Sequence, residues 1–268
     1  MRTIAIVSAT GGAGRTTLTA ELASLLAARG QRVLAVECDP RNVLALHFGL
    51  RESARDGLVS HLAGHADAWA NAALQSDDGV LVLPWGSEDG TTDAATSAAL
   101  DARPHWLHDL LARVDLPREA IALIDCTAWP SPHARQAIDA AEFVLAVVTP
   151  DATACATLPR LQAALRRAGR HSAFVTNAVV PARALHTDIV ALLRARLGAA
   201  MLPYVIHADT GVPAALASGE GFCLNTPESQ AAHDLNGIAS WLLHWANPPA
   251  EDASMPAQPV QRAQGAAP

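Results

Sequence analysis

The fold of this chain is decided by one short stretch near its start, Ser8-Ala9-Thr10-Gly11-Gly12-Ala13-Gly14-Arg15-Thr16-Thr17. An apolar run at 4–7 precedes it and an alanine- and leucine-rich run at 18–28 follows it, which predicts a strand, a glycine loop and a helix. Three glycines within four residues let backbone N–H groups turn inward, because no Cβ is in the way, and the helix points the positive end of its dipole at the same place. The stretch therefore predicts a cradle for an anion.

The spacing of this cradle is that of a P-loop with two departures. A Walker A motif reads G-x-x-x-x-G-K-[ST], and here Ala9 stands at the first glycine and Arg15 at the lysine. The chain contains no lysine, so all 19 basic residues are arginine, and a planar guanidinium does not automatically fit the slot of an ammonium group. Thr16 and Thr17 supply hydroxyls where a P-loop binds Mg²⁺. The alternative is a glycine turn that only connects a strand to a helix.

The size, charge and cysteine content of the chain favour some classes of protein and argue against others. At 268 residues and 50% hydrophobic content, the chain is long enough for one large α/β domain. Its net charge of −7 and pI near 5.8 argue against a protein that coats nucleic acid or an anionic membrane through its overall field, although they leave room for a local basic patch. The four cysteines form no C-x-x-C pair, and we see neither a secretory leader nor an apolar run near the ~20 residues of a membrane span. We therefore expect a cytoplasmic protein with reduced thiols.

Apolar runs alternate with helical stretches along most of the chain. The expected strands lie at 4–7, 32–36, 80–83, 120–124, 143–148, 172–176 and 203–206, and the expected helices at 18–28, 94–112, 152–168, 185–197 and 228–245. Because the strands are continuous apolar runs, we predict a P-loop NTPase-like α/β fold, a three-layer sandwich with a mostly parallel central sheet covered by helices on both faces. In this interpretation residues 1–247 form one nucleotide-binding domain, and 248–268 form a disordered tail rich in alanine, proline and glutamine.

Three carboxylates stand at or just after the ends of predicted strands. Glu37 and Asp39 follow the strand at 32–36, and Asp125 ends the run at 120–124 in the manner of a Walker B motif. Carboxylates at the C-terminal ends of parallel strands lie over the ligand crevice, and a site for phosphate and Mg²⁺ needs one of them to hold a metal-bound water. With Thr16, Asp39 and Asp125 are therefore the candidate metal ligands.

A dinucleotide-binding fold is the main alternative for this pattern. Gly12 and Gly14 open a helix, and Glu37 closes the second strand about 20 residues later, where such a fold holds a ribose. The third glycine of that motif is Thr17 here, and Asp125 would have no role. Both points favour the P-loop interpretation.

Two segments resemble the ParA/MinD ATPases. Residues 10–17 resemble the deviant Walker A motif of that class, K-G-G-x-G-K-[ST]-[ST], and residues 36–40 resemble its V-D-x-D-P segment. Within the class, the segments 204–209, 214–219 and 229–235 most resemble the MinD-like proteins of bacterial cellulose-synthesis operons, the BcsQ family. The similarity extends from the start of the chain to about residue 245.

The resemblance implies an ATP-sandwich homodimer that binds ATP and Mg²⁺. Thr16 would ligate Mg²⁺, Asp125 would hold a metal-bound water, Asn177 would lie near the adenine, and the segment 207–212 would close on the base. The implied nucleotide-binding residues are Gly11, Gly12, Ala13, Gly14, Arg15, Thr16, Thr17, Asn177 and His207.

The resemblance also implies partners and a location. It points to a cytoplasmic regulator of bacterial cellulose synthesis and secretion that meets components of the cellulose synthase complex at the inner membrane. Recruitment to that membrane or to the cell pole would go through these partners. We expect no direct contact with nucleic acid and no insertion into the membrane.

Two departures from the family pattern bear on catalysis. The lysine that reaches across the dimer corresponds to Thr10, which is uncharged, and the aspartate that orients the attacking water corresponds to Glu37, which is one methylene longer. With Arg15 at the P-loop lysine, Glu37 and Arg15 are the expected catalytic residues. Both departures affect hydrolysis more than binding.

Three hypotheses of function stay open. The first is an ATP-dependent dimeric switch with slow hydrolysis, the second a scaffold that holds ATP without hydrolysing it, and the third a partitioning or division-site ATPase that binds DNA or a septal membrane. The acidic balance disfavours the third, and so does the lack of any arginine between 196 and 262 to flank the last helix. Trp241 and Trp245 of that helix are therefore expected to face the core or a partner.

Overall fold

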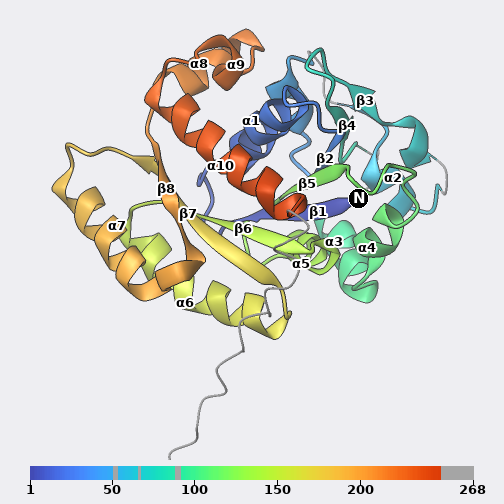
Figure 1. Cartoon of the computed structure of the whole chain (residues 1–268). Helices are drawn as coiled ribbons and strands as arrows, with labels where there is room; N and C mark the ends of the chain where they lie inside the picture. Colours follow the sequence, from blue (N-terminus) through green and yellow to red (C-terminus); the bar gives the residue numbers. More distant parts are fainter. Residues whose placement is uncertain (51–53, 66–67, 88–91, 249–268) are drawn as a thin grey trace, which may run out of the picture.

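The predicted strands line up in one mostly parallel sheet. The computed structural model describes residues 1–50, 54–65, 68–87 and 92–248, and within them an eight-stranded sheet has the order β3-β4-β2-β5-β1-β6-β7-β8 (Figure 1). The strands are β1 (Arg2–Val7), β2 (Val33–Cys38), β3 (Leu74–Gln75), β4 (Leu81–Leu83), β5 (Ile121–Cys126), β6 (Phe143–Val148), β7 (His171–Val179) and β8 (Met201–His207). Neighbouring strands pair in parallel except for β3, which is antiparallel to β4. The predicted fold class is confirmed.

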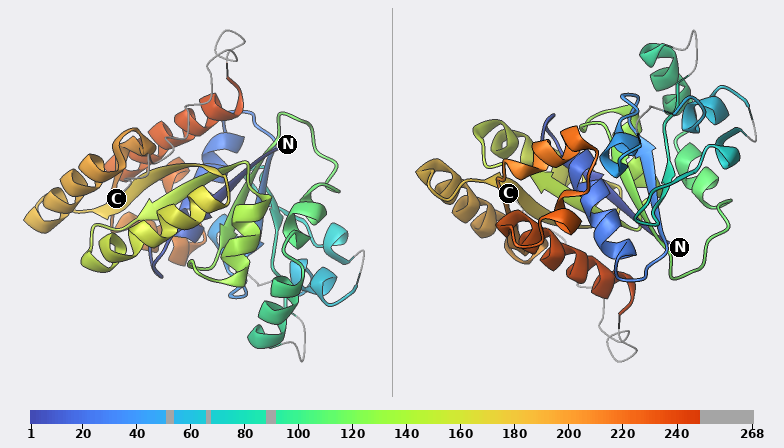
Figure 2. Two further views of the ribbon diagram at one scale, coloured as in Figure 1. Left: turned by 90° about the horizontal axis from the view of Figure 1, so that it is seen from below. Right: turned by 90° about the horizontal axis from the view of Figure 1, so that it is seen from above.

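Helices cover both faces of this sheet, as Figure 2 shows from two sides. The α-helices are α1 (Arg15–Ala27), α2 (Leu58–Leu62), α3 (Asp93–Ala102), α4 (Trp106–Leu111), α5 (Pro132–Ala140), α6 (Ala152–Arg167), α7 (Ala184–Leu197), α8 (Gly211–Ser218), α9 (Phe222–Asn225) and α10 (Gln230–Ala246). Short 3₁₀ turns are η1 (Leu44–Phe48), η2 (Ala68–Asn71) and η3 (Gly198–Ala200). One apolar cluster joins α1 and α10 to the sheet, and a second joins α4, α5, α6 and α7 to its other face.

The central strands explain the continuous apolar runs of the sequence. In β1, Ile4 and Ile6 pack with the α1 side, while Ala5 and Val7 pack with the α5 side, and all four are fully buried. A strand with helices on both faces has no solvent side, so polar alternation is absent. The carboxyl ends of β1, β2 and β5 are adjacent, and the register places Glu37 beside Asp125.

The prediction of one helix at 94–112 is wrong in one respect, because the structure has two helices there, α3 and α4. The chain breaks at 103–105 between α3 and α4, where Pro104 removes a backbone donor and disfavours a helical residue before it. Gln136 of α5 is buried at the break. Its amide nitrogen donates to the Leu100 and Arg103 carbonyls at 3.0 and 2.6 Å, and its oxygen accepts from the Leu107 N–H at 3.0 Å. One side chain from a distant helix therefore satisfies the backbone groups that the break exposes.

The last helix faces the core, as the sequence suggested. Trp241 and Trp245 of α10 lie 5.4 and 4.9 Å from the ring of Phe143, centroid to centroid, and the Arg2 guanidinium lies over the Trp245 ring. In the described part of the chain, no helix combines the length and apolarity needed to cross a membrane. The tail predicted at 248–268 lies, except for its first residue, outside the described residues.

A buried carboxylate connects the first helix to the end of the fold. Glu21, on α1, accepts hydrogen bonds from the backbone N–H groups of Phe222 at 3.0 Å and Cys223 at 2.8 Å, which are the first residues of α9. Glu21 is only 5% exposed, and α9 has no side-chain cap of its own. The helix that follows the glycine loop thus supplies the N-terminal cap of α9.

We predict that Glu21→Ala lowers the free energy of unfolding by about 2–3 kcal/mol, because two buried N–H groups lose a charged acceptor. Glu21→Gln keeps one acceptor oxygen and should lose about half as much. Urea unfolding followed by circular dichroism measures both. Equal stability of the wild type and the alanine variant would show that the α1–α9 connection contributes nothing.

Candidate nucleotide-binding site

The glycine loop lies at the carboxyl edge of the sheet between β1 and α1. Gly12 and Gly14 have φ angles of +70° and +88°, in the left-handed region that glycine adopts without strain. A Cβ at Gly14 would lie 2.4 Å from the side-chain nitrogen of Asn177, whereas Gly11 and Gly12 border open space. Among the described residues no side chain caps the first turn of α1, which leaves its N–H groups available to the anion that the sequence predicts there.

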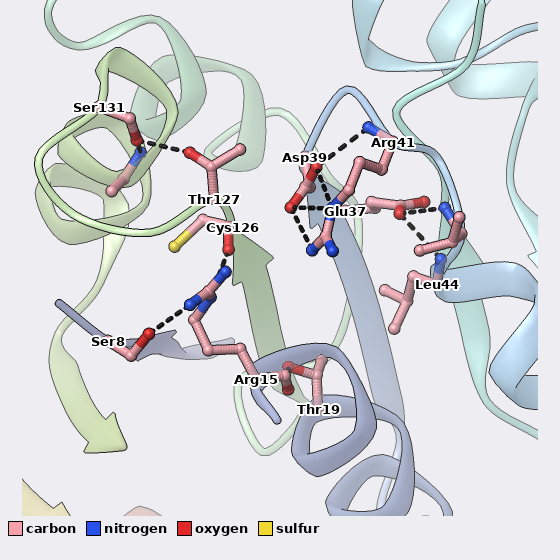
Figure 3. Close-up of polar contacts among 12 residues, drawn as sticks. Ser8, Arg15, Thr19, Glu37, Asp39, Arg41, Leu44, Cys126, Thr127 and Ser131 are labelled. Atoms are coloured by element: carbon pink, nitrogen blue, oxygen red, sulfur yellow. Dashed lines mark hydrogen bonds and ion pairs between the residues drawn. The ribbon is translucent and has the colours of Figure 1, made fainter. Parts of the chain in front are cut away.

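Arg15 is buried and braces the loop. Its Nη1 donates to the Ser8 hydroxyl, and its Nε donates to the Cys126 carbonyl at 2.8 Å (Figure 3). Nη1 also donates to the Thr10 carbonyl at 2.8 Å. Only 5% of the residue is exposed. In this position the Arg15 side chain connects the start of α1 to the glycine loop and to the end of β5. The motif predicts a role for Arg15 toward phosphate, and no sequence pattern indicates these three protein acceptors.

Asp125 is a buried carboxylate beside the first turn of α1. It is fully buried, and neither of its oxygens has a hydrogen-bond partner of good geometry among the described residues. Burial raises the pKa of Asp125 to about 7, while the neighbouring Thr16 hydroxyl and the Arg15 charge oppose that rise. A buried carboxylate of this kind is costly unless a cation neutralises it. The pairing of Asp125 with Thr16 therefore fits Mg²⁺.

The donors available at this edge suit a metal that arrives with a ligand. Among the described residues, no group of three or more His, Cys, Asp or Glu side chains is placed to hold a metal ion by itself. Mg²⁺ is usually held by one or two protein oxygens together with phosphate oxygens and water. The site thus fits a magnesium–nucleotide complex better than a free metal ion.

Glu37 reaches away from the glycine loop. Its Oε1 accepts hydrogen bonds from the backbone N–H groups of Val43 at 2.6 Å and Leu44 at 2.8 Å, at the start of η1. Figure 3 shows Glu37 directed toward Leu44 and Arg15 directed toward Cys126. Glu37 is fully buried, its Oε2 has no partner among the described residues, and burial raises its pKa to about 8. The extra methylene of glutamate serves this contact with η1.

Asp39 is held by its near neighbour. Both of its carboxylate oxygens contact the Arg41 guanidinium, the shortest distance being 2.8 Å, and its Oδ1 also accepts from the Arg41 backbone N–H at 3.0 Å. Asp39 is 1% exposed, whereas the Arg41 side chain is 59% exposed. Of the three candidate metal ligands, Thr16 and Asp125 lie together, and Asp39 is occupied by an arginine.

Asn177 and His207 lie farther along the carboxyl edge, on β7 and β8. The Asn177 side chain donates to the Ala13 carbonyl at 2.8 Å, so it is in contact with the glycine loop. His207 is bound to α10: its Nδ1 lies 2.7 Å from the Asp234 carboxylate, which also accepts the His207 backbone N–H at 3.0 Å. Within the described ranges, no hydrogen bond joins His207 to the loop.

Sequence reasoning missed several residues that shape the site. Ser8 and the Cys126 carbonyl hold Arg15, and Asp234 fixes His207. Ala178, directly after Asn177, has a φ of +58°, which costs an alanine roughly 1 kcal/mol. Asp234 gave one usable signal, because it is a carboxylate on the apolar last helix. A backbone carbonyl and a φ angle leave no signal in the sequence.

The raised pKa values of Asp125 and Glu37 predict a pH dependence of stability. In the folded protein these carboxyls keep their protons up to about pH 7 and 8, whereas in the unfolded chain they lose them near 3.8 and 4.5. The free energy of unfolding without ligand should therefore fall as the pH rises from about 5 to 8. Urea unfolding across that range measures the slope, which Asp125→Asn and Glu37→Gln should each reduce.

An exposed carboxyl provides the control for this measurement. Asp115→Asn should leave the slope as it is in the wild type, because Asp115 is solvent-exposed. If the slope were equally steep with Asp125 and Glu37 both replaced, these two carboxyls would not be its source.

Comparison with known proteins agrees with this geometry. The family model of the cellulose biosynthesis protein BcsQ matches residues 1–243. A BcsQ protein of Salmonella typhi is 28% identical over 239 residues, which cover 87% of this chain and 91% of that protein. An uncharacterised ATP-binding protein of Methanocaldococcus jannaschii is 30% identical over 243 residues, which cover 90% of this chain and 87% of that protein.

A solved structure shares the fold. The septum site-determining protein MinD of Pyrococcus horikoshii, determined in complex with Mg-ADP, matches with a TM-score of 0.73 and 24% identity. The match covers 92% of this chain and 97% of that one. The resemblance inferred from the glycine loop and the late segments is thereby confirmed, and the chain belongs to the BcsQ family of cellulose biosynthesis proteins, with the fold of the MinD/ParA-like P-loop ATPases.

Proposed function

We propose that this protein is an ATP-dependent dimeric switch that regulates bacterial cellulose synthesis and secretion. The observation that carries the proposal is the buried Asp125 carboxylate, which lies beside the Thr16 hydroxyl at the foot of the glycine loop and makes no hydrogen bond of good geometry with the described residues. Mg²⁺, when bound with ATP, supplies the positive charge that such a carboxylate requires. The family and the solved relative with Mg-ADP support the same ligand.

The residues of this chain would hold the nucleotide from three sides. Backbone N–H groups from Gly11 to Thr17 would donate to the phosphates, and the Thr16 hydroxyl and Asp125 would serve the metal. Asn177 would fix the loop through the Ala13 carbonyl. The segment around His207, held by Asp234, would border the base.

Hydrolysis would be slow because the groups that normally assist it are absent or occupied. Thr10 carries no charge, so it cannot neutralise the phosphates of a partner subunit. Arg15 donates to three protein oxygens, and Oε1 of Glu37 accepts two backbone N–H groups. Only Oε2 of Glu37 is left to orient a water.

Glu37 also gives the switch an element that can move. Its carboxylate caps η1, and η1 borders a surface hollow of about 650 Å³ that α8 lines on the other side. A nucleotide that drew Glu37 toward the phosphates would release the N–H groups of Val43 and Leu44. The position of η1 would then report whether nucleotide is bound.

A scaffold that holds ATP permanently is the second candidate. The contacts of Glu37 with η1 favour it, because a residue used for structure cannot also orient water well. Turnover and the oligomeric state with ATP distinguish the two candidates. In either case we propose components of the cellulose synthase complex at the inner membrane as the partners.

We predict that Asp125→Ala weakens binding of ATP in the presence of Mg²⁺ by about 10- to 100-fold. The variant would lose the group proposed to hold a metal-bound water, while the fold, in which this carboxylate makes no hydrogen bond of good geometry, should be kept. Calorimetry with and without Mg²⁺ measures the effect, with Asp115→Ala as the matched control. Equal affinity of the variant and the wild type would remove Asp125 from the metal site.

A second prediction concerns dimerisation and turnover. With ATP and Mg²⁺ the protein should form a dimer without any partner and hydrolyse ATP well below roughly 1 s⁻¹. Thr10→Lys should raise turnover at least tenfold, since a cation supplied across an interface contributes on the order of 10³ to 10⁵. Size-exclusion chromatography and a phosphate-release assay measure the two properties.

Thr10→Gln is the control, because it adds length without charge. Turnover of the wild type above 1 s⁻¹ would mean that another cation does the work of the missing lysine. A monomer with ATP bound would contradict the dimeric switch.

A further inference from the structure

Positive charge is concentrated in one part of this acidic protein. The whole chain carries 26 acidic and 19 basic residues, yet the stretch 152–200 contains seven arginines and a single acidic residue, Asp188. This stretch forms α6, β7 and α7 at the β8 edge of the sheet. The sequence left room for a local basic patch, and the structure places one there.

Six of these arginines are exposed to solvent. They are Arg160, Arg166, Arg167, Arg183, Arg194 and Arg196. Arg194 is nine residues from Leu185, on the opposite side of α7, and its guanidinium donates to the Pro203 carbonyl at 3.4 Å, so we call the other five arginines the arginine face. The seventh, Arg170, is partly buried and lies 3.5 Å from the Asp139 carboxylate. Among the described residues no ion pair is recorded for any member of the arginine face. Their charge is therefore available to an external partner.

Large apolar side chains are exposed in the same place. Leu185 and Leu192 of α7 are 63% and 55% exposed, more than any other large apolar side chain in the described ranges. They are seven residues apart, and Arg196 follows four residues later, so all three lie on one side of the helix. This side of α7 therefore carries two exposed leucines and Arg196, together with the exposed Asp188, which lies one helical turn from each leucine.

This side of α7 is continuous with α6. The positive charge of Arg196 reaches Cys155 of α6, where it opposes the rise that burial causes in the pKa of the thiol. Figures 1 and 2 show α7 as the outermost helix at its end of the molecule, so none of the described elements covers its outer side. A protruding helix meets a flat surface more readily than a concave one.

We propose that the arginine face, with Leu185 and Leu192, docks the protein on an anionic lipid surface. Arginines near such a surface each contribute about 1 kcal/mol, and leucine side chains enter the boundary between headgroups and acyl chains. Phosphate groups of nucleic acid would use the arginines and leave both leucines in water, which is why lipid is the better occupant.

The acidic remainder of the protein does not prevent this contact. At physiological ionic strength the Debye length is about 8 Å, so negative charges on distant faces are screened while the arginine face lies against the headgroups. The face lies on α6 and α7, and the glycine loop lies between β1 and α1. The inference therefore goes beyond the proposed nucleotide switch and does not depend on it.

Sedimentation with vesicles tests the proposal. Wild-type protein, without nucleotide, is mixed with phosphatidylcholine vesicles that contain or lack phosphatidylglycerol. We expect binding only to the anionic vesicles, weakened by added salt. The double variant Arg160→Gln with Arg196→Gln should lower the affinity at least tenfold, and Leu185→Gln with Leu192→Gln should also lower it.

The matched control removes the same charge elsewhere. Arg32 and Arg118 are exposed and lie outside the arginine face, so changing both to glutamine should alter vesicle affinity less than twofold. Melting temperature and Mg-ATP affinity, unchanged in all variants, show that the fold and the nucleotide site are intact. A failure of ATP binding would therefore not be confused with a failure of docking.

Three results would overturn the proposal. The first is no binding of the wild type to anionic vesicles. The second is an equal loss of vesicle affinity in the Arg32 and Arg118 control variant and in the Arg160 and Arg196 variant. The third is tighter binding to a DNA duplex, measured by fluorescence anisotropy, that needs the arginines but not the leucines. That result would assign the face to nucleic acid.

Discussion

A buried guanidinium holds the nucleotide edge of this protein together. Arg15 opens α1, and its donors reach the loop at Thr10 and Ser8 and the end of β5 at Cys126. A buried cation is costly unless every donor finds an acceptor, so these contacts fix the loop relative to the sheet. Arginine suits this position because its planar fork carries five donors and can serve the loop and β5 at once.

Two buried carboxyl groups near Arg15, those of Asp125 and Glu37, have raised pKa values. Burial raises the pKa of Asp125 more than the positive charge of Arg15 lowers it, and repulsion from Asp125 adds to the raised pKa of Glu37 on the neighbouring strand. The ligand-free site thus contains acidic groups that retain protons near neutral pH. In the proposed switch, arrival of Mg²⁺ with phosphate would change the charge balance of the site, and Glu37 would transmit the change to η1 through its hydrogen bonds with Val43 and Leu44.

The fold keeps its two charged regions apart. The acidic groups lie at the carboxyl edge beside the glycine loop, while the arginines lie on α6 and α7 at the β8 end of the sheet. Because each region is screened from the other, the proposed response to nucleotide and the proposed contact with an anionic surface would not interfere with each other. The link from α1 to α9 through Glu21 gives the first helix a mechanical connection to the C-terminal elements.

The sequence by itself determined the strand, loop and helix at the start of the chain and the mostly parallel sheet, because apolar periodicity and glycine spacing are local properties. The family followed from the same residues and is confirmed by the match over residues 1–243. Only the tertiary structure decided where Arg15 and Glu37 direct their polar atoms, and that α3 and α4 are separate helices. The partner of Arg15 on β5 is 111 residues away in sequence, and Gln136 reaches a break 33 residues before it. Contacts of that kind depend on how the layers pack, and no local pattern encodes them.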